Sequence, residues 1–302
     1  MDSVLFVGPL DRVLLLRTLP MLEGLRPVAL AAIAQHAQER SFSRGTLLSS
    51  PDASAQAVYL IVEGEVEITR DGAASRRVQA GEAVGFIEML SRVKQPLEVR
   101  ASSDTVALEL DWDAQIDVCE EHFPVVMQYI SYLARLTALE LQRQGLASAQ
   151  SGPSPTTQQF GPHLNFVQRV LVLSRSRAFS SGCLDALSEL SQHVEEVRWE
   201  DGDPIWATGE AAEDFFLLAS GLLRCSQASG VEFTCGPGKL AGVHEALYGS
   251  ERWYAAVSEG PTIGLKIDLE PFVDILEDHF DLALDFMGLL AADLLSLQSG
   301  DG

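Results

Sequence analysis

The sequence from Tyr59 to Ile68 is Tyr-Leu-Ile-Val-Glu-Gly-Glu-Val-Glu-Ile. On both sides of Gly64 the side chains alternate with a period of two, as Val66 and Ile68 do with the glutamates between them. Such alternation is typical of β-strands, and a glycine between two short runs is typical of a tight turn. The pattern predicts a β-hairpin whose turn lies at Gly64.

The glycine of this segment recurs later in the chain at a fixed offset. Gly221 follows Gly64 by 157 residues (221 − 64), and Glu277-x-His279-Phe280 follows Glu120-x-His122-Phe123 by the same distance. A repeat of this length is too long for a solenoid unit and suits a whole domain. The sequence therefore predicts one domain present twice. Three further glycine pairs share the offset: Gly45 with Gly202, Gly81 with Gly238, and Gly85 with Gly242.

The periodicity predicts the same order of elements in each copy, and so a mainly β fold with flanking helices (α+β). A first domain is expected over 1–146, a linker rich in Ser, Pro, Gly and Gln over 147–163, and a second domain over 164–302. In the first domain we expect helices over 10–37, strands over 38–111, and helices over 113–121 and 122–144. In the second we expect helices over 164–177 and 183–195, strands over 197–268, and a closing helix over 280–298.

The composition excludes several classes of function. With 21 basic and 43 acidic residues, the formal net charge of −22 repels nucleic acid and anionic membrane surfaces.

The four cysteines lack metal-ligand spacing, which favours free thiols in a reducing cytoplasm. The Met-Asp start carries no basic residue before the first apolar run, so we expect no secretory signal. No apolar run reaches the roughly 20 residues that a membrane helix needs.

Motifs for catalysis and metal binding are also missing from the sequence. The chain contains no GxSxG, P-loop or GxGxxG pattern, and none of its six histidines forms a His-x-His pair. We therefore expect neither an enzyme, nor catalytic residues, nor a metal site.

Two stretches give the chain a resemblance to the cyclic-nucleotide-binding domain family, which includes catabolite-activator-type regulators and protein kinase A regulatory subunits. Residues 59–68 resemble the family's YLxxxGxVxV hairpin. Residues 242–252, Gly-Val-His-Glu-Ala-Leu-Tyr-Gly-Ser-Glu-Arg, resemble its phosphate-binding cassette, GExALxxxxxR. The resemblance covers about 12–145 and 165–298 and implies two tandem β-jelly-roll barrels with flanking helices. No stretch is expected to form the helix-turn-helix that some members carry.

The resemblance also implies how a cassette would bind a cyclic nucleotide. A short helix after the glycine presents free N–H groups to the cyclic phosphate. An arginine ten residues after the glycine pairs with the phosphate, and a glutamate directly after the glycine accepts the ribose 2′-hydroxyl.

The first cassette departs from the family at both charged positions. After Gly85, Phe86 replaces the ribose glutamate and Gln95 replaces the arginine. Loss of a buried Arg–phosphate contact typically costs about 2 kcal/mol or more, so we expect this site to be degenerate. Arg92 and Lys94 are the nearby cations that could substitute.

The second cassette keeps more of the pattern and is the expected ligand site. Arg252 stands ten residues after Gly242, but Val243 replaces the ribose glutamate, and His244 is the one histidine in a candidate site. Trp253 and Tyr254 follow where small residues are usual; they could stack on a base or fill the pocket.

Both cassettes carry a glutamate at their fourth position, Glu88 and Glu245. A carboxylate near a helix start is favoured by the helix dipole and can accept free N–H groups. One hypothesis is that each glutamate occupies the place of the phosphate and holds its domain in a fixed conformation. The alternative is that each points into solvent.

Together these observations predict a non-catalytic cytoplasmic regulatory protein without a cofactor, whose second domain is the place for a cyclic nucleotide. The alternative is a ligand-independent scaffold or assembly subunit that uses the same folds for protein contacts. A protein partner is expected, or a homodimer through the C-terminal helix, where Met287, Leu290, Leu294 and Leu297 have coiled-coil-type spacing. The same stripe could instead pack on its own domain.

Overall fold

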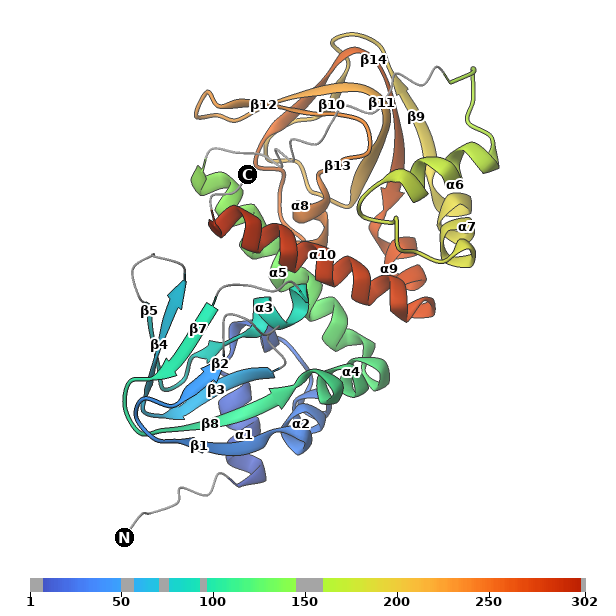
Figure 1. Ribbon diagram of the computed structural model, residues 1–302. Helices are drawn as coiled ribbons and strands as arrows, with labels where there is room; N and C mark the ends of the chain where they lie inside the picture. Colours follow the sequence, from blue (N-terminus) through green and yellow to red (C-terminus); the bar gives the residue numbers. More distant parts are fainter. Residues whose placement is uncertain (1–7, 50–56, 71–75, 93–96, 145–159, 300–302) are drawn as a thin grey trace. The chain divides into compact units, whose positions relative to one another are not determined.

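A computed structural model describes residues 8–49, 57–70, 76–92, 97–144 and 160–299 (Figure 1). Its internal contacts divide the chain into two compact units, Met1–Tyr129 and Ile130–Gly302. The division falls inside the long helix α5 (Phe123–Gln144), which therefore contributes residues to both units. Most of the expected linker, 147–163, lies outside the described residues.

The first unit begins with helical segments and continues with two four-stranded antiparallel sheets, in the orders β1-β8-β3-β6 and β2-β7-β4-β5. A cluster of buried side chains with members from both sheets, including Ile61 of β3 and Val66 of β4, forms the core between them. The bounds are α1 (Pro9–Leu16), η1 (Pro20–Leu22), α2 (Pro27–His36), β1 (Gln38–Phe42), β2 (Leu47–Ser49), β3 (Ala57–Glu63), β4 (Glu65–Arg70), β5 (Arg76–Gln79), β6 (Ala83–Val84), α3 (Phe86–Ser91), β7 (Leu97–Ala101), β8 (Thr105–Asp111) and α4 (Trp112–Glu121).

The segment around Gly64 is not the hairpin that its alternation predicts. Strand β3 pairs with β6 and β8, whereas β4 pairs with β5 and β7, so the chain passes from one sheet to the other at Gly64. Gly64 has φ of +91°, and a Cβ there would lie 2.4 Å from the carbonyl oxygen of Asp104. Only glycine accommodates this close approach, which makes it the corner of the two sheets.

The second unit repeats the element order at the same offset. Strand β9 starts 157 residues after β1 (195 − 38), helix α8 starts 157 after α3 (243 − 86), and α9 starts 157 after α4 (269 − 112). The bounds are α6 (Phe166–Arg175), α7 (Leu184–His193), β9 (Glu195–Trp199), β10 (Pro204–Trp206), β11 (Asp214–Ser226), β12 (Glu232–Cys235), β13 (Leu240–Ala241), α8 (Val243–Tyr248), β14 (Ala255–Asp268), α9 (Leu269–Asp278) and α10 (Phe280–Ser299).

Two long strands, β11 and β14, run through the whole sheet structure of the second unit. The sheet order is β10-β14-β11-β12, with β13 added on β11 and β9 on β14. The pairing of β11 with β14 shifts register on either side of Ser220, next to Gly221, at the position that corresponds to the Gly64 corner. The antiparallel sheets with flanking helices confirm the predicted fold class. Among the described strands no closed barrel forms, because the sheets stay open at their edges.

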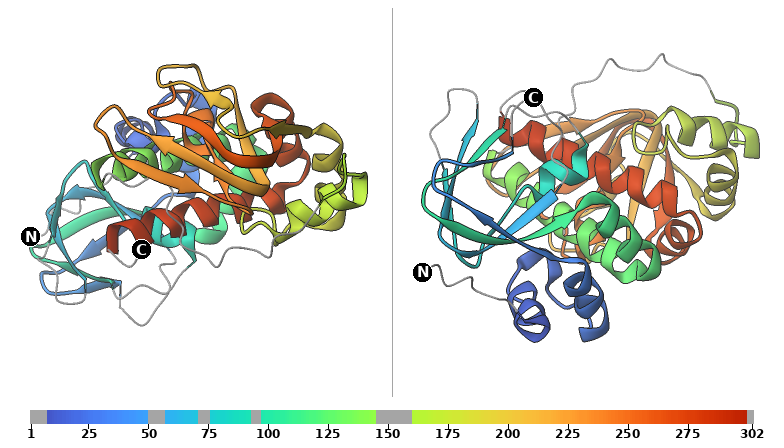
Figure 2. Two further views of the ribbon diagram at one scale, coloured as in Figure 1. Left: turned by 90° about the horizontal axis from the view of Figure 1, so that it is seen from above. Right: turned by 60° about the horizontal axis from the view of Figure 1, so that its bottom comes forward.

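The apolar stripe of helix α10 is largely buried. Met287, Leu290 and Leu294 are buried by the rest of the chain, and Leu297 is half-buried. In the second unit the end of α5 lies beside α10, where Gln144 Nε2 donates to the carbonyl oxygen of Leu297 (Figure 2). A dimer through α10 would have to use other residues than this stripe.

Candidate functional site

The second cassette is built on a glycine that an arginine side chain touches. Gly242 has φ of +77° and precedes α8, which ends at Gly249 with φ of +72°. A Cβ on Gly242 would lie 2.2 Å from Nη1 of Arg252. The glycine is therefore required both by its left-handed backbone and by the position of the guanidinium.

The Arg252 guanidinium is enclosed by protein groups, with its side chain only 2% exposed. Nη1 donates to the carbonyl oxygen of Gly242 at 2.7 Å. Nη2 donates to the carbonyl oxygen of Asp214 at 2.5 Å and to its Oδ1 at 2.8 Å. The guanidinium carbon also lies 4.5 Å from the ring centroid of Trp206. A buried charge needs such compensation, because an unpaired ion in the interior is strongly destabilising.

Asp214 belongs to a wider chain of charges at the edge of this site. Lys266 Nζ lies 3.4 Å from Asp214 Oδ2 and 2.7 Å from Asp268 Oδ1. These hydrogen bonds and carboxylates raise the pKa of Lys266. Asp214 thus has two cationic partners, Arg252 on the buried side and Lys266 on the more exposed side.

Glu245 is buried on α8, in the same part of the unit as Arg252. Burial raises the pKa of its carboxyl, against opposing contributions from its own backbone N–H, the Arg252 charge and the indole of Trp253. The Nε1 of Trp253 is itself buried and has no partner in hydrogen-bond geometry among the described residues. The solvent-exposed alternative for Glu245 is therefore wrong, and the capping hypothesis for this glutamate stays a prediction.

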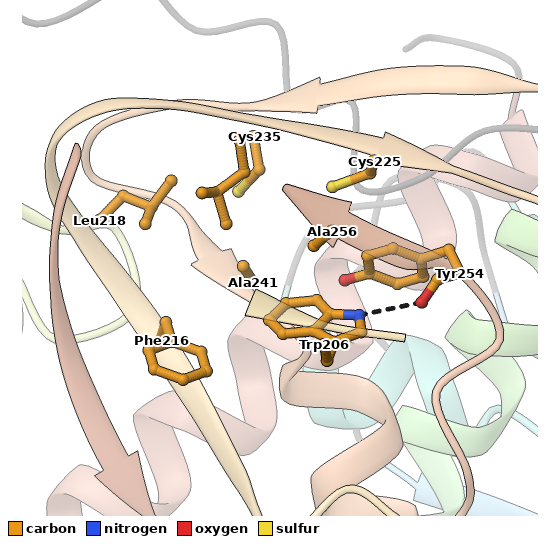
Figure 3. Close-up of a cluster of buried hydrophobic side chains, with 9 residues drawn as sticks. Trp206, Phe216, Leu218, Cys225, Cys235, Ala241, Tyr254 and Ala256 are labelled. Atoms are coloured by element: carbon orange, nitrogen blue, oxygen red, sulfur yellow. Dashed lines mark hydrogen bonds between the residues drawn. The ribbon is translucent and has the colours of Figure 1, made fainter. Parts of the chain in front are cut away.

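Aromatic side chains fill the interior of the second unit beside the cassette (Figure 3). Tyr254 is buried, and its hydroxyl accepts a hydrogen bond from the Gly242 N–H at 3.1 Å. Trp206 Nε1 donates to the carbonyl oxygen of Tyr254 at 2.9 Å. Trp253 is half-buried and stacks on Phe233, with 6.2 Å between ring centroids. In this arrangement Trp253 and Tyr254 pack with protein groups and fill the space of the cassette.

Two of the expected site residues face a different space. Val243 and His244 line a small cavity of about 40 Å³, together with Lys239, Phe286 and Asp293. Burial lowers the pKa of His244 to about 4, so the imidazole is neutral at pH 7. The structure thus brings Gly242, Glu245, Arg252 and Tyr254 together and separates His244 from them.

The described residues of the first cassette make contacts with aromatic side chains. Gly85, with φ of +90°, precedes α3, and Phe86 packs edge-on against Tyr129 with 4.9 Å between ring centroids. Glu88 is half-buried. The guanidinium of Arg92 lies 4.5 Å from the ring centroid of Trp112. Gln95 and Lys94 lie outside the described residues.

Sequence reasoning missed the partners of Arg252. Asp214 and Trp206 lie in β11 and β10, far from the cassette in sequence. A signal for them exists in the comparison of the two copies. At the offset of 157 residues, Asp214 corresponds to Ala57, Trp206 to Ser49 and Arg252 to Gln95. The two side chains that contact the guanidinium, those of Asp214 and Trp206, are absent from the first copy.

No site for a metal ion is found in the part of the chain that the structure describes. No three His, Cys, Asp or Glu side chains gather there in a way that could hold one. Over the same residues, none of the helices is both long and apolar enough to cross a membrane.

Comparison with known proteins agrees with the geometry of the first unit. Residues 39–122 match the family model described as "Cyclic nucleotide-binding domain". The chain contains a cyclic nucleotide-binding domain. This segment of the domain runs from β1 to the end of α4 and includes the first cassette.

A curated relative aligns over most of the chain at low sequence identity. The chain is 22% identical over 245 residues to the cGMP-dependent protein kinase egl-4 of Caenorhabditis elegans. The alignment covers 81% of this chain and 25% of the kinase. The chain thus spans about a quarter of the length of that kinase.

Two solved structures are similar over nearly the whole chain. One is the regulatory subunit of a cAMP-independent protein kinase A from Trypanosoma brucei, at 17% identity, with 90% of this chain and 89% of that chain covered and a TM-score of 0.36. The other is the regulatory domain of Toxoplasma gondii PKA with cAMP, at 14% identity, with 97% of each chain covered and a TM-score of 0.36.

Proposed function

We propose that this chain is a non-catalytic, cytoplasmic regulatory protein with two tandem cyclic-nucleotide-binding-like domains that acts through protein contacts. In this proposal the second domain keeps its folded conformation without a nucleotide, because protein groups already accept the hydrogen bonds of the cassette arginine, Arg252. The first domain, which lacks both charged anchors, serves structure and partner contact. The element order that repeats at 157 residues supports the tandem arrangement.

The observation that carries the proposal is the enclosure of Arg252. Its three hydrogen bonds go to Gly242 and Asp214, and its cationic face lies over Trp206. A cyclic phosphate would have to displace the Asp214 carboxylate from the guanidinium, and the loss of this ion pair offsets part of what the phosphate contact contributes. The ribose would find Val243, which accepts no hydrogen bond through its side chain. The Arg252–Asp214 pair and the missing ribose acceptor both lower the affinity for a nucleotide.

A second candidate function, a nucleotide sensor, is favoured by the position of Lys266. If a phosphate took the place of Asp214 at Arg252, the Asp214 carboxylate would still be balanced by Lys266 at 3.4 Å. This neighbour reduces the cost of the exchange. A nucleotide that moved Asp214 towards Lys266 would shift the population of the cassette conformation, and thereby the partner surface.

Isothermal titration calorimetry with the full chain separates the two candidates. Cyclic AMP, cyclic GMP and cyclic dinucleotides are titrated into the wild type and into Arg252→Ala. We expect no saturable heat from any of them. Saturable heat that disappears in Arg252→Ala, with the variant still folded by circular dichroism, would overturn the ligand-independent proposal and establish the sensor.

A further inference from the structure

Each unit has, ahead of its strands, a pair of helices joined by an equivalent arginine–carbonyl hydrogen bond. Arg12 Nη1 of α1 donates to the carbonyl oxygen of Ala37, directly after α2, at 2.6 Å. Arg169 Nη1 of α6 donates to the carbonyl oxygen of Val194, directly after α7, at 3.3 Å. Both members of the second tie stand 157 residues after those of the first (169 − 12 and 194 − 37). The two pairs are therefore built alike.

Both pairs present exposed apolar side chains at equivalent positions. Leu10 and Leu14 on α1 correspond to Val167 and Leu171 on α6, and all four are between 42% and 71% exposed. Residues four apart lie on one side of a helix, so each couple forms a continuous apolar strip. Isolated exposed apolar residues are ordinary, but a strip that recurs in both copies marks a contact surface. The first apolar face consists of Leu10, Leu14 and Val28, and the second consists of Phe166, Val167, Leu171 and Leu184.

The helix that packs next to each pair carries an exposed acidic stripe. Helix α4 contacts α2, and α9 contacts α7 (Figures 1 and 2). Neither α4 nor α9 contains a basic residue, and within the described residues none of their stripe carboxylates forms an ion pair. The stripes occupy matching positions, with Asp113, Asp117, Glu120 and Glu121 on α4 and Glu270, Asp274, Glu277 and Asp278 on α9.

The helix dipole favours only the first-turn members of the stripes, Asp113 and Glu270, and the other stripe carboxylates are unfavourable for the helices that carry them. Like charges four residues apart destabilise a helix by about 0.2–0.5 kcal/mol per pair, and acidic residues at its C-terminal end oppose the helix dipole. Folding therefore does not explain why both copies have them. A bound partner with positive charge would remove the repulsion.

We propose that each unit binds a basic amphipathic helix, which lays its apolar side on the apolar face and directs Lys or Arg side chains to the acidic stripe. This inference rests on the role of protein contacts in the proposed function. The charges select this occupant over a second copy of the chain, because another chain of net charge −22 would bring like charge to the stripes. An amphipathic helix carries apolar anchors three and four residues apart, a spacing that matches the apolar residues four apart on α1 and α6. Two equivalent faces make the chain bivalent.

The test uses a labelled synthetic Leu/Lys peptide of about 18 residues, long enough to form an amphipathic helix. Its control is a scrambled peptide of the same composition, which has equal charge but no apolar side. We expect the full wild-type chain to bind two peptides in calorimetry and the scrambled peptide at least about tenfold more weakly. The pair Leu10→Ser with Leu14→Ser, or Val167→Ser with Leu171→Ser, should leave one binding site. The quadruple variant should leave none, whereas the matched control Leu47→Ser on β2 should keep two.

Three results would overturn the inference. One is unchanged peptide binding by the quadruple variant, and another is equal binding of the scrambled peptide, which would show charge attraction alone. The third is a wild-type dimer in sedimentation velocity that the quadruple variant dissociates, which would make a second copy the occupant. If the quadruple variant fails to fold, Asp117→Asn with Asp274→Asn should weaken peptide binding and leave stability unchanged or higher; unchanged binding overturns the inference. No nucleotide takes part, so this test fails or succeeds independently of the nucleotide titration.

Discussion

Arg252 and Asp214 form a charge pair across the second cassette, with Nη2 and Oδ1 2.8 Å apart and the arginine buried. The pair joins the end of the cassette to the start of β11 and holds the guanidinium against Gly242. The buried group that the family pattern assigns to a phosphate here contributes to the structure of the unit itself.

Removing the Arg252 side chain should therefore destabilise the protein even when no ligand is present. We expect Arg252→Ala to lower the free energy of unfolding by about 3–5 kcal/mol, as found for buried pairs that lose one partner. Arg252→Lys should recover only part of it, because an ammonium cannot reproduce the planar fork. The matched control is Arg224→Ala, which breaks an exposed pair with Glu232 and should cost less than about 1 kcal/mol. Urea unfolding measures all three; equal effects of Arg252→Ala and Arg224→Ala would contradict the enclosure.

Gly242 offers a second measure of how firmly the guanidinium is held. Gly242→Ala places a Cβ 2.2 Å from Nη1 of Arg252, whereas Gly238→Ala, with nearly the same φ, meets nothing within 4 Å. The Gly238 variant should show only the left-handed strain of about 1–2 kcal/mol. The Gly242 variant should lose about 1–3 kcal/mol more. In an Arg252→Ala background this excess should vanish; an excess that persists would place the strain elsewhere.

Glu245 predicts a pH dependence with a defined sign. Because burial raises the pKa of its carboxyl in the folded state, the folded protein binds this proton more tightly than the unfolded chain does. Its contribution to stability is thus present below the unfolded pKa, about 4.3, and is lost as pH rises through the folded value. Glu245→Gln should gain stability relative to the wild type between pH 4 and pH 7 in chemical unfolding. A relative loss over that range would mean that the charged form is the one stabilised.

The cysteines should differ sharply in reactivity. Cys183 is exposed, whereas Cys119, Cys225 and Cys235 are buried, and burial raises the pKa of each of these three thiols. Because the thiolate is the reactive form, one thiol per chain should react quickly with Ellman's reagent in the native protein, and four in denaturant. Cys183→Ser should abolish the fast phase. Fast reaction of a second thiol would contradict the burial of the core cysteines.

Much of the element order could be predicted because periodicity is local. The helices of both copies and the acidic helix before α5 lie where the apolar spacing places them. The Gly64 hairpin could not be excluded in this way, because alternation shows that β3 and β4 are strands but not which strands they pair with. The approach of Gly64 to Asp104 is a contact between distant parts of the sequence.

The candidate site was predictable to the level of residues but not of partners. The spacing from Gly242 identifies Arg252, yet its counter-ion Asp214 is 38 residues earlier and carries no motif. The stripe on α10 has the same 3-4-3 spacing whether it packs on its own unit or on a second helix, so burial in the structure had to decide. The partners of Arg252 could have been found by comparing the two copies, because Asp214 of the second copy corresponds to Ala57 of the first.

NMR of the arginine side chains reports whether protein groups enclose Arg252 when no nucleotide is present. In the nucleotide-free wild type, the Arg252 guanidinium should give N–H signals that exchange slowly with water, because its donors are bound to Gly242 and Asp214. Arg252→Lys assigns these signals. We expect these signals to persist unshifted at millimolar cyclic AMP and cyclic GMP. Fast exchange in the free protein, or signals that move on addition of either nucleotide, would contradict this expectation.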